Sequence, residues 1–120
     1  MASDILYERH GAVRLITIDR ADQMNSLDFA ANDRLTDIWR EFAADDEARA
    51  AVITGAGNKA FCAGADLKTY TIDYATRPEA EFRERYTDGT GFGGITRGLD
   101  IDKPIVAAIN GFAISGGLEL

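Results

Sequence analysis

The 120-residue sequence predicts an α/β fold assembled from repeated strand-and-turn units. Residues 5–18 contain two short segments rich in β-branched residues, with a turn signal between them. Residues 27–44 carry apolar side chains at helical spacing and are followed by a short apolar strand. Residues 52–64 and 106–116 share one order of features: a strand, a glycine turn, then a small residue followed by glycine. Such repetition is typical of spiral or layered α/β folds, in which successive turns meet along one edge.

The first half of the chain predicts a hairpin and a long helix. Ile5–Arg9 and Val13–Ile18 are expected to be its strands, joined by a turn at residues 10–12 that includes His10. The helix is predicted over Leu27–Ala44, with Asn25 or Ser26 as the N-cap and Asp28 in the first turn. The apolar residues that recur along the helix are Leu27, Ala31, Leu35, Ile38, Trp39 and Phe42, of which Trp39 and Phe42 are expected core contacts.

The second half predicts two more strands and two helical segments. Ala50–Thr54 is expected to be a buried strand that follows the helix through a right-handed parallel crossover. Pro78–Arg85 is highly charged and predicts a solvated helix, whereas Gly89–Gly98, with five glycines, is either a mobile loop or a helix of poor propensity. Ile105–Ile109 predicts a strand, and Gly116–Leu120 the first turn of a helix. Because so short a helix is marginal alone, we expect residues 1–120 to be the amino-terminal portion of one domain, its carboxy-terminal helical region absent.

Composition excludes several classes of function. The net charge of −7 argues against broad nucleic-acid binding, which requires a basic surface. No apolar run approaches the ~20 residues that cross a bilayer, so no membrane partner is expected. The amino terminus does not resemble a signal peptide, and a single cysteine cannot form an internal disulfide, which favours a reducing, cytoplasmic setting. One cysteine with one histidine makes a poor metal site, so no metal is expected.

Two glycine-bearing segments carry the candidate chemistry. Residues 61–67 read FCAGADL, and residues 110–119 read NGFAISGGLE. Small residues and glycines after a strand let backbone N–H groups approach a ligand without obstruction from side chains. Two such N–H groups from separate segments can converge on one oxygen and form an oxyanion hole. Cys62 is interpreted as a small buried residue rather than a nucleophile, because no paired base is visible.

These segments resemble the F-x-A-G-A-D-[LI] and N-G-x-x-x-G-G-G-x-E segments of the crotonase (enoyl-CoA hydratase/isomerase) superfamily. Residues 25–27 and Lys103–Pro104 match the family as well, so the resemblance extends over essentially all 120 residues. It implies a crotonase-like ββα spiral, incomplete at the C-terminus, and an acyl-CoA substrate. Coenzyme A would enter as part of the thioester, with no covalently bound cofactor. The complete protein would be a homo-oligomer, a trimer or a hexamer.

The resemblance also implies roles for individual residues. It places the first oxyanion donor on the amide of Ala63 and the second on that of Gly116. Glu119 matches the first of two glutamates that act as acid and base in the family's hydratases. Ser115 stands where the family often has glycine, and is expected to narrow the pocket or cap the helix.

The resemblance leaves the reaction open, because the second glutamate would lie beyond Leu120. Reversible hydration of a 2-enoyl-CoA is the leading expectation, and double-bond isomerisation or another crotonase-type reaction is the alternative. A catalytically incomplete fragment that serves only in binding or assembly is the rival from outside the enzymes. We expect the 120-residue chain alone to be inactive.

Coenzyme A would lie beside two loops, with its adenine held mainly by backbone groups. Lys68 and Lys59 are candidates for a phosphate-binding rim, and Asp66 is expected to have a structural role as a turn or cap residue. The residues that the resemblance assigns to coenzyme A are Asn25, Ser26, Leu27, Ala63, Gly64, Ala65, Asp66, Leu67 and Lys68.

Overall fold

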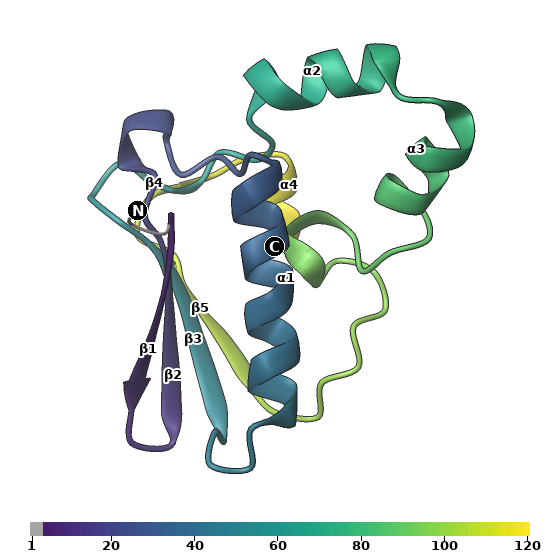
Figure 1. Cartoon of the computed structure of the whole chain (residues 1–120). Coiled ribbons are helices and arrows are strands. Elements are labelled where there is room, and N and C mark those ends of the chain that lie inside the picture. The colour runs from purple at the N-terminus through teal and green to yellow at the C-terminus, as the bar shows by residue number, and fades with distance from the viewer. Residues whose placement is uncertain (1–3) are drawn as a thin grey trace.

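The computed structural model describes residues 4–120 and shows a four-stranded sheet covered on one face by a long helix (Figure 1). The strand order is β1-β2-β3-β5. Strands β1 (Ile5–His10) and β2 (Val13–Ile18) pair antiparallel, whereas β2 pairs parallel with β3 (Ala50–Gly55), and β3 with β5 (Ile105–Ala108). The predicted hairpin and parallel crossover are therefore confirmed. His10 differs from its prediction, because it is the last residue of β1 and pairs with Val13.

Helix α1 (Phe29–Ala44) lies across the sheet and buries its apolar stripe against it (Figure 1). Its N-cap is Asp28, whose Oδ1 accepts from the Ala31 N–H at 2.8 Å. The predicted caps at Asn25 and Ser26 are wrong, because the chain passes through a left-handed residue at Asn25 and reaches helical geometry only after Asp28. A carboxylate in this position satisfies an otherwise unpaired N–H and favours the positive end of the helix.

A second, two-stranded sheet joins the glycine turns. Strand β4 (Ala60–Cys62) pairs parallel with β6 (Phe112–Ala113). Both strands are too short to show a pattern in the sequence. The helical turn expected at the end of the chain is α4 (Gly116–Glu119), which directly follows this sheet.

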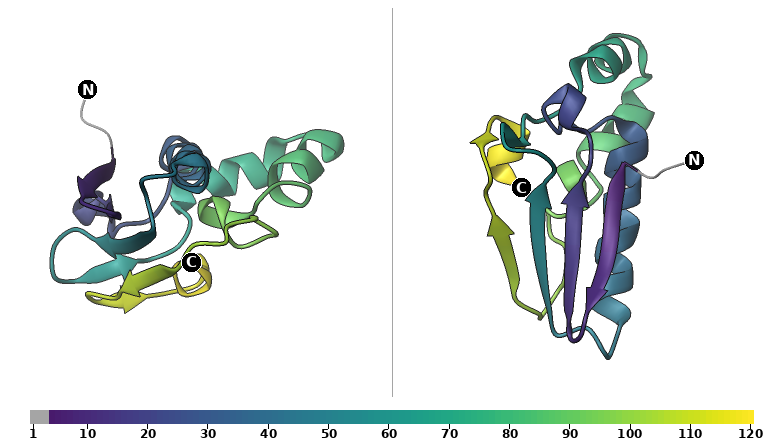
Figure 2. Two further views of the ribbon diagram at one scale, coloured as in Figure 1. Left: turned by 90° about the horizontal axis from the view of Figure 1, so that it is seen from below. Right: turned by 90° about the vertical axis from the view of Figure 1, so that its left-hand side faces the viewer.

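Helices α2 (Leu67–Thr76) and α3 (Glu79–Tyr86) form a lobe beyond the amino-terminal end of α1 (Figure 1, Figure 2). Helix α3 confirms the charged helix predicted for this region, whereas α2 was not predicted. Residues 4–120 also contain two single 3-10 turns, η1 (Ala21–Gln23) and η2 (Phe92–Gly94). Within residues 4–120, no helix combines the length and apolar character that a membrane span requires.

The glycine-rich stretch from 89 to 98 is a loop that contains only η2, so the helical alternative is wrong. Gly93 and Gly94 have φ of 65° and 74° and are buried against α1. A Cβ on Gly94 would lie 2.4 Å from Thr36 Oγ1, so the loop packs closely only because side chains are absent there. The Trp39 Nε1–H donates to the Gly93 carbonyl at 2.9 Å and fixes this contact.

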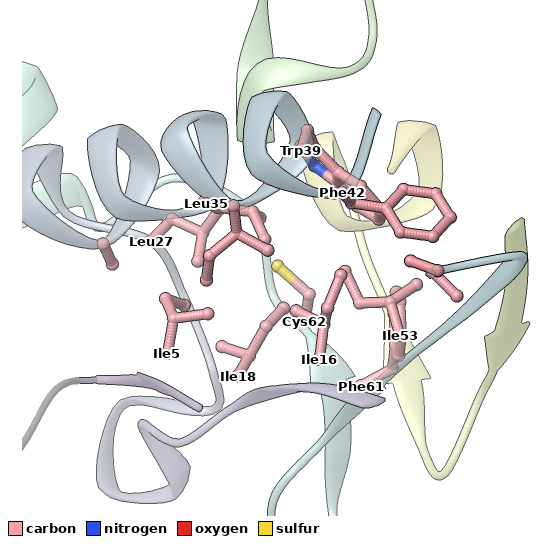
Figure 3. Close-up of a cluster of buried hydrophobic side chains, with 14 residues drawn as sticks. Ile5, Ile16, Ile18, Leu27, Leu35, Trp39, Phe42, Ile53, Phe61 and Cys62 are labelled. Carbon is pink, nitrogen blue, oxygen red and sulfur yellow. The ribbon is translucent and has the colours of Figure 1, made fainter. Parts of the chain in front are cut away.

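The core lies between α1 and the sheet (Figure 3). Trp39 and Phe42 are fully buried, as predicted. Cys62 and Phe61 of β4 extend the core toward the second sheet. The buried side chains labelled in Figure 3 are Ile5, Ile16, Ile18, Leu27, Leu35, Trp39, Phe42, Ile53, Phe61 and Cys62.

Candidate functional site

The ladder between β4 and β6 brings the two glycine-bearing motifs together. The Phe112 N–H donates to the Lys59 carbonyl at 3.0 Å, and the Ile114 N–H to the Cys62 carbonyl at 3.1 Å. Beyond the ladder, a Cβ on Gly64 would lie 3.4 Å from the Gly116 nitrogen. The two segments that follow these strands are therefore adjacent, as expected for two glycine-bearing motifs that contribute to one site.

Three successive amides of the first motif, at residues 63–65, differ in their hydrogen bonding. The Ala63 N–H donates to the Met24 carbonyl at 3.1 Å. The Gly64 N–H bonds to the Cys62 sulfur. Within residues 4–120, the Ala65 N–H donates to no acceptor. The assignment of an oxyanion donor to Ala63 therefore does not fit the structure, because its N–H is already used; the available amide is that of Ala65.

The orientation of Ala65 follows from its pairing with the loop before α1. Ala65 forms a parallel bridge with Leu27, in which the Leu27 N–H donates to the Gly64 carbonyl and the Asp66 N–H to the Leu27 carbonyl, both at 2.8 Å. In a parallel bridge the neighbours of the central residue make the hydrogen bonds, so that residue's own N–H points away from the partner strand. The Ala65 amide is thus directed away from Leu27.

Gly116 begins α4, and its N–H belongs to the first turn, where a helix supplies no acceptor. Its amide donates to no acceptor among residues 4–120. The preceding Ser115 has φ 54° and ψ −123° and makes no side-chain cap hydrogen bond, so the capping role considered for its hydroxyl is wrong. Gly117 packs against β4 so tightly that a Cβ there would lie 1.9 Å from the Cys62 carbonyl oxygen.

Glu119 lines a cavity of about 900 Å³ between α1, the α2–α3 lobe and the glycine-rich loop. A Cβ on Gly116 would lie 3.0 Å from the ring of Phe92, which also lines this cavity. Tyr70, which also lines this cavity, is buried, and this burial raises the pKa of its hydroxyl to about 12. Apart from Gly91 and Gly98, the lining residues are polar or aromatic, without a branched aliphatic side chain. They include Tyr70, Tyr74, Arg85, Tyr86, Arg97 and Glu119.

The residues expected to contact coenzyme A divide into buried and exposed groups. Asn25 is fully buried, and its amide group donates to the carbonyls of Ala56 and Ala60 and accepts from the Arg20 N–H. Leu27 is also fully buried, and Ser26 is 8% exposed. The side chains of Asn25 and Leu27 therefore shape the loop from inside, and neither is accessible to a ligand.

Among the other predicted contacts, Asp66 caps a helix, and Leu67, Lys68 and Lys59 lie at the surface. Asp66 is the N-cap of α2 and accepts from the Lys68 N–H at 3.0 Å, in agreement with its predicted structural role. Leu67 and Lys68 are exposed in the first turn of α2. Lys59 is exposed in the loop between β3 and β4, where it lines a separate cavity of about 200 Å³.

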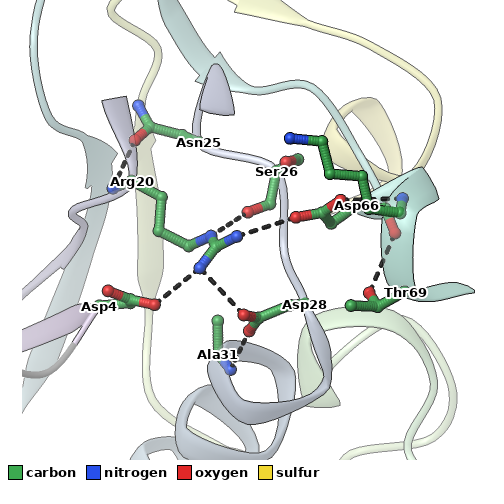
Figure 4. Close-up of polar contacts among 9 residues, drawn as sticks. Asp4, Arg20, Asn25, Ser26, Asp28, Ala31, Asp66 and Thr69 are labelled. Carbon is green, nitrogen blue, oxygen red and sulfur yellow. Dashed lines mark hydrogen bonds and ion pairs between the residues drawn. The ribbon is translucent and has the colours of Figure 1, made fainter. Parts of the chain in front are cut away.

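Arg20, whose side chain is 9% exposed, is a residue of this region that the sequence pattern did not reveal. Its guanidinium joins the N-caps of α1 and α2, Asp28 and Asp66, and also contacts Asp4 and the Ser26 carbonyl (Figure 4). The acidic partners are scattered over sixty residues of sequence, so no local pattern could have revealed the cluster.

Cys62 is buried, and this burial raises the pKa of its thiol, which disfavours the thiolate that a nucleophile requires. This agrees with the interpretation of Cys62 as a packing residue.

Comparison with known proteins identifies the family. The family model for enoyl-CoA hydratase/isomerase matches residues 8–120. The carnitinyl-CoA dehydratase of Citrobacter koseri is 39% identical over all 120 residues, and that of Escherichia coli K12 is 38% identical. The chain spans 43% of the length of these curated relatives.

Solved structures of the family share the fold. The crystal structure of carnitinyl-CoA hydratase from Mycobacterium avium matches the whole chain with a TM-score of 0.80 and 44% identity, and the chain covers 43% of it. A probable enoyl-CoA hydratase/isomerase from Mycobacterium abscessus matches 99% of the chain with a TM-score of 0.77 and 36% identity, and the chain covers 42% of it. The predicted crotonase-like α/β fold is confirmed, and the chain belongs to the enoyl-CoA hydratase/isomerase family.

Proposed function

We propose that the protein carrying this chain adds water reversibly to a 2-enoyl-CoA and stabilises the thioester enolate through the amides of Ala65 and Gly116. Enolate formation places negative charge on the carbonyl oxygen, and preorganised N–H groups stabilise such charge more strongly than water does. The observation that carries the proposal is the adjacency of the two segments that follow β4 and β6, each of which contains an amide without an acceptor among residues 4–120.

Glu119 acts in this proposal as one acid/base group. It follows the Gly116 amide by one helical turn and faces the cavity of about 900 Å³. The acyl group enters that cavity. Coenzyme A, as part of the substrate, lies along the exposed first turn of α2, where Lys68 is available to its phosphates.

The amide assignment is tested by Ala65→Pro, which removes the N–H. Loss of one oxyanion donor typically lowers kcat about 10²- to 10³-fold, and we expect a loss of that order in steady-state hydration of crotonyl-CoA. Circular dichroism confirms that the variant is folded. Undiminished kcat in a folded Ala65→Pro variant would exclude this amide from the mechanism.

The acid/base role is tested by Glu119→Gln, which keeps the shape of the side chain and removes its charge. We expect kcat to fall by about two orders of magnitude or more. The matched control is Glu79→Gln, because Glu79 is likewise an exposed glutamate in the first turn of a short helix, α3. Equal rates for the two variants would contradict a catalytic role for Glu119.

The similar relatives named carnitinyl-CoA dehydratase or hydratase favour a second candidate, the same chemistry on carnitinyl-CoA. Eliminating water from this substrate and hydrating an enoyl-CoA require the same stabilised enolate. Comparing kcat/KM for carnitinyl-CoA dehydration with that for crotonyl-CoA hydration distinguishes the candidates. Conversion of a 3-enoyl-CoA into a 2-enoyl-CoA, in the absence of both crotonyl-CoA hydration and carnitinyl-CoA dehydration, would instead indicate an isomerase.

A further inference from the structure

The guanidinium of Arg20 binds four oxygen acceptors from three separate parts of the chain (Figure 4). Its Nε donates to the Ser26 carbonyl at 2.7 Å, and one terminal nitrogen contacts Asp4 at 2.7 Å and Asp28 at 3.0 Å. The other terminal nitrogen contacts Asp66 at 3.0 Å. The side chains of Arg20 and Asp66 are only 9% and 11% exposed, so water screens this pair weakly.

Two of these contacts flank the bridge that orients the Ala65 amide. Ser26 directly precedes Leu27, and Asp66 directly follows Ala65, so the guanidinium is bonded to the neighbour of each bridge residue. A guanidinium is planar and rigid, and its donors have a fixed geometry. It therefore fixes the spacing and the relative angle of the two segments whose hydrogen bonds direct the Ala65 N–H.

The backbone of Arg20 is held as well, so the side chain starts from a fixed point. The Arg20 N–H donates to Asn25 Oδ1 at 2.9 Å, and its carbonyl accepts from the Asn25 N–H at 2.9 Å. Asn25 is fully buried. The Arg20–Asn25 hydrogen bonds, the contacts of the guanidinium and the Leu27–Ala65 bridge thus form one continuous network, which ends next to the Ala65 amide.

We propose that Arg20 is the positioning residue of the oxyanion site: through Ser26 and Asp66 it sets the direction of the Ala65 N–H without touching substrate. It also neutralises the Asp66 carboxylate, which would otherwise repel an oxyanion forming beside the adjacent residue. This inference rests on the proposed function, since it assigns Arg20 a role at that site.

The test measures polarisation of the substrate carbonyl directly. A 2-enoyl-CoA conjugated to a dimethylaminophenyl group absorbs at longer wavelength when hydrogen bonds draw electrons toward its thioester oxygen. The red shift on binding is recorded for the purified protein and for Arg20→Met, Arg20→Lys and Asp4→Asn, together with kcat and KM for crotonyl-CoA. Asp4→Asn is the matched control, because it alters another arm of the same guanidinium, at a partner 47% exposed and away from the bridge.

Arg20→Met is expected to lose most of the red shift and to lower kcat roughly ten- to hundredfold, the order expected when a donor is misplaced, with KM changed much less. Arg20→Lys keeps the positive charge but loses the planar group of hydrogen-bond donors, so it should lose part of the red shift. If Arg20→Met does not fold, the Lys variant provides the test. Asp4→Asn should retain both the shift and kcat.

Two results would overturn the inference. One is a full red shift and unchanged kcat in Arg20→Lys or in a folded Arg20→Met variant. The other is an equal loss in Asp4→Asn, which would indicate general loosening of the fold. Absence of a red shift in the unaltered protein would instead contradict the proposed function itself, so the two failures are distinguishable.

Discussion

Ser115 adopts φ 54° and ψ −123° immediately before the Gly116 amide, a backbone conformation that favours glycine. Its hydroxyl makes no cap hydrogen bond that would offset the strain. A non-glycine residue held in such a region costs about 1–3 kcal/mol, and strain of this kind concentrates at functional sites. The strained residue directly precedes Gly116, whose nitrogen lies beside Gly64.

Replacing Ser115 with glycine should therefore stabilise the fold. We expect Ser115→Gly to raise the free energy of unfolding by about 1 kcal/mol, because relief of strain exceeds the added chain entropy of glycine. Urea denaturation followed by Trp39 fluorescence measures the change. Ser115→Ala is the control, since it removes the hydroxyl and keeps the strain. Equal stabilities for the Gly and Ala variants would show that the backbone is unstrained.

The sequence located the two candidate segments, but it did not show which amide of the first segment lacks an acceptor within residues 4–120. Availability of an amide depends on which N–H groups the rest of the fold uses, and the acceptor for Ala63 is the carbonyl of Met24, nearly forty residues earlier. Likewise, Asn25 resembled a cap or a ligand contact, whereas its buried amide group binds two carbonyls beyond residue 55. Motif letters do not encode such long-range hydrogen bonds.

Among the elements, α1 was predictable and α2 was not. Five residues of α1 are buried at helical spacing, so its amphipathic pattern is evident in the sequence. Helix α2 buries only Tyr70 and leaves Leu67 and Ile72 exposed, so it lacks a periodic apolar face. Strands β4 and β6 contain three and two residues, too few to show alternation.

Docking of α4 onto β4 depends on the absence of a side chain at Gly117. A Cβ there would lie 1.9 Å from the Cys62 carbonyl, so Gly117→Ala must push the helix away from the sheet. Overpacking of this kind typically costs about 1–3 kcal/mol, and we expect that loss in urea denaturation. Under the proposed function, kcat should fall as well, because α4 carries Gly116 and Glu119.

The control for this prediction is Gly89→Ala. A Cβ on Gly89 would approach nothing closer than 3.7 Å, and its φ lies outside the left-handed range. This variant should keep the stability of the unaltered chain to within about 0.5 kcal/mol. A Gly117→Ala variant as stable as Gly89→Ala would mean that α4 does not pack on β4 as described.

At the scale of the whole molecule, two arginines with largely covered side chains, Arg14 within β2 and Arg20 just after it, bond to opposite ends of α1. Arg20 bonds to Asp28, the N-cap of α1, whereas Arg14 bonds to Asp45, its C-cap. The side chain of Arg14 is 3% exposed and also donates to the Gly11 carbonyl in the β1–β2 turn. In a chain with a net charge of −7, each of these cations is surrounded by carboxylate or carbonyl oxygens.

The Arg14–Asp45 contact should make folding stability depend on pH in the acid range. The hydrogen bond from Arg14 lowers the pKa of Asp45 below its ordinary value of 3.8, and a backbone N–H from Glu47 adds to this effect. A carboxyl whose pKa is lowered by folding stabilises the native state fully above its unfolded pKa. That stabilisation is lost as the pH falls through the lowered, folded pKa.

Asp45→Asn should therefore reduce the free energy of unfolding at pH 7, and the deficit should shrink as the pH falls below about 4 because the unaltered carboxyl also becomes neutral. Urea denaturation at a series of pH values from 7 to 2 measures this difference. Asp46→Asn is the matched control, since Asp46 is exposed and belongs to none of the ion pairs within residues 4–120. A deficit of constant size over the whole range would show that the contribution of Asp45 does not depend on its charge, and that the tie between Arg14 and the end of α1 is not an ionic one.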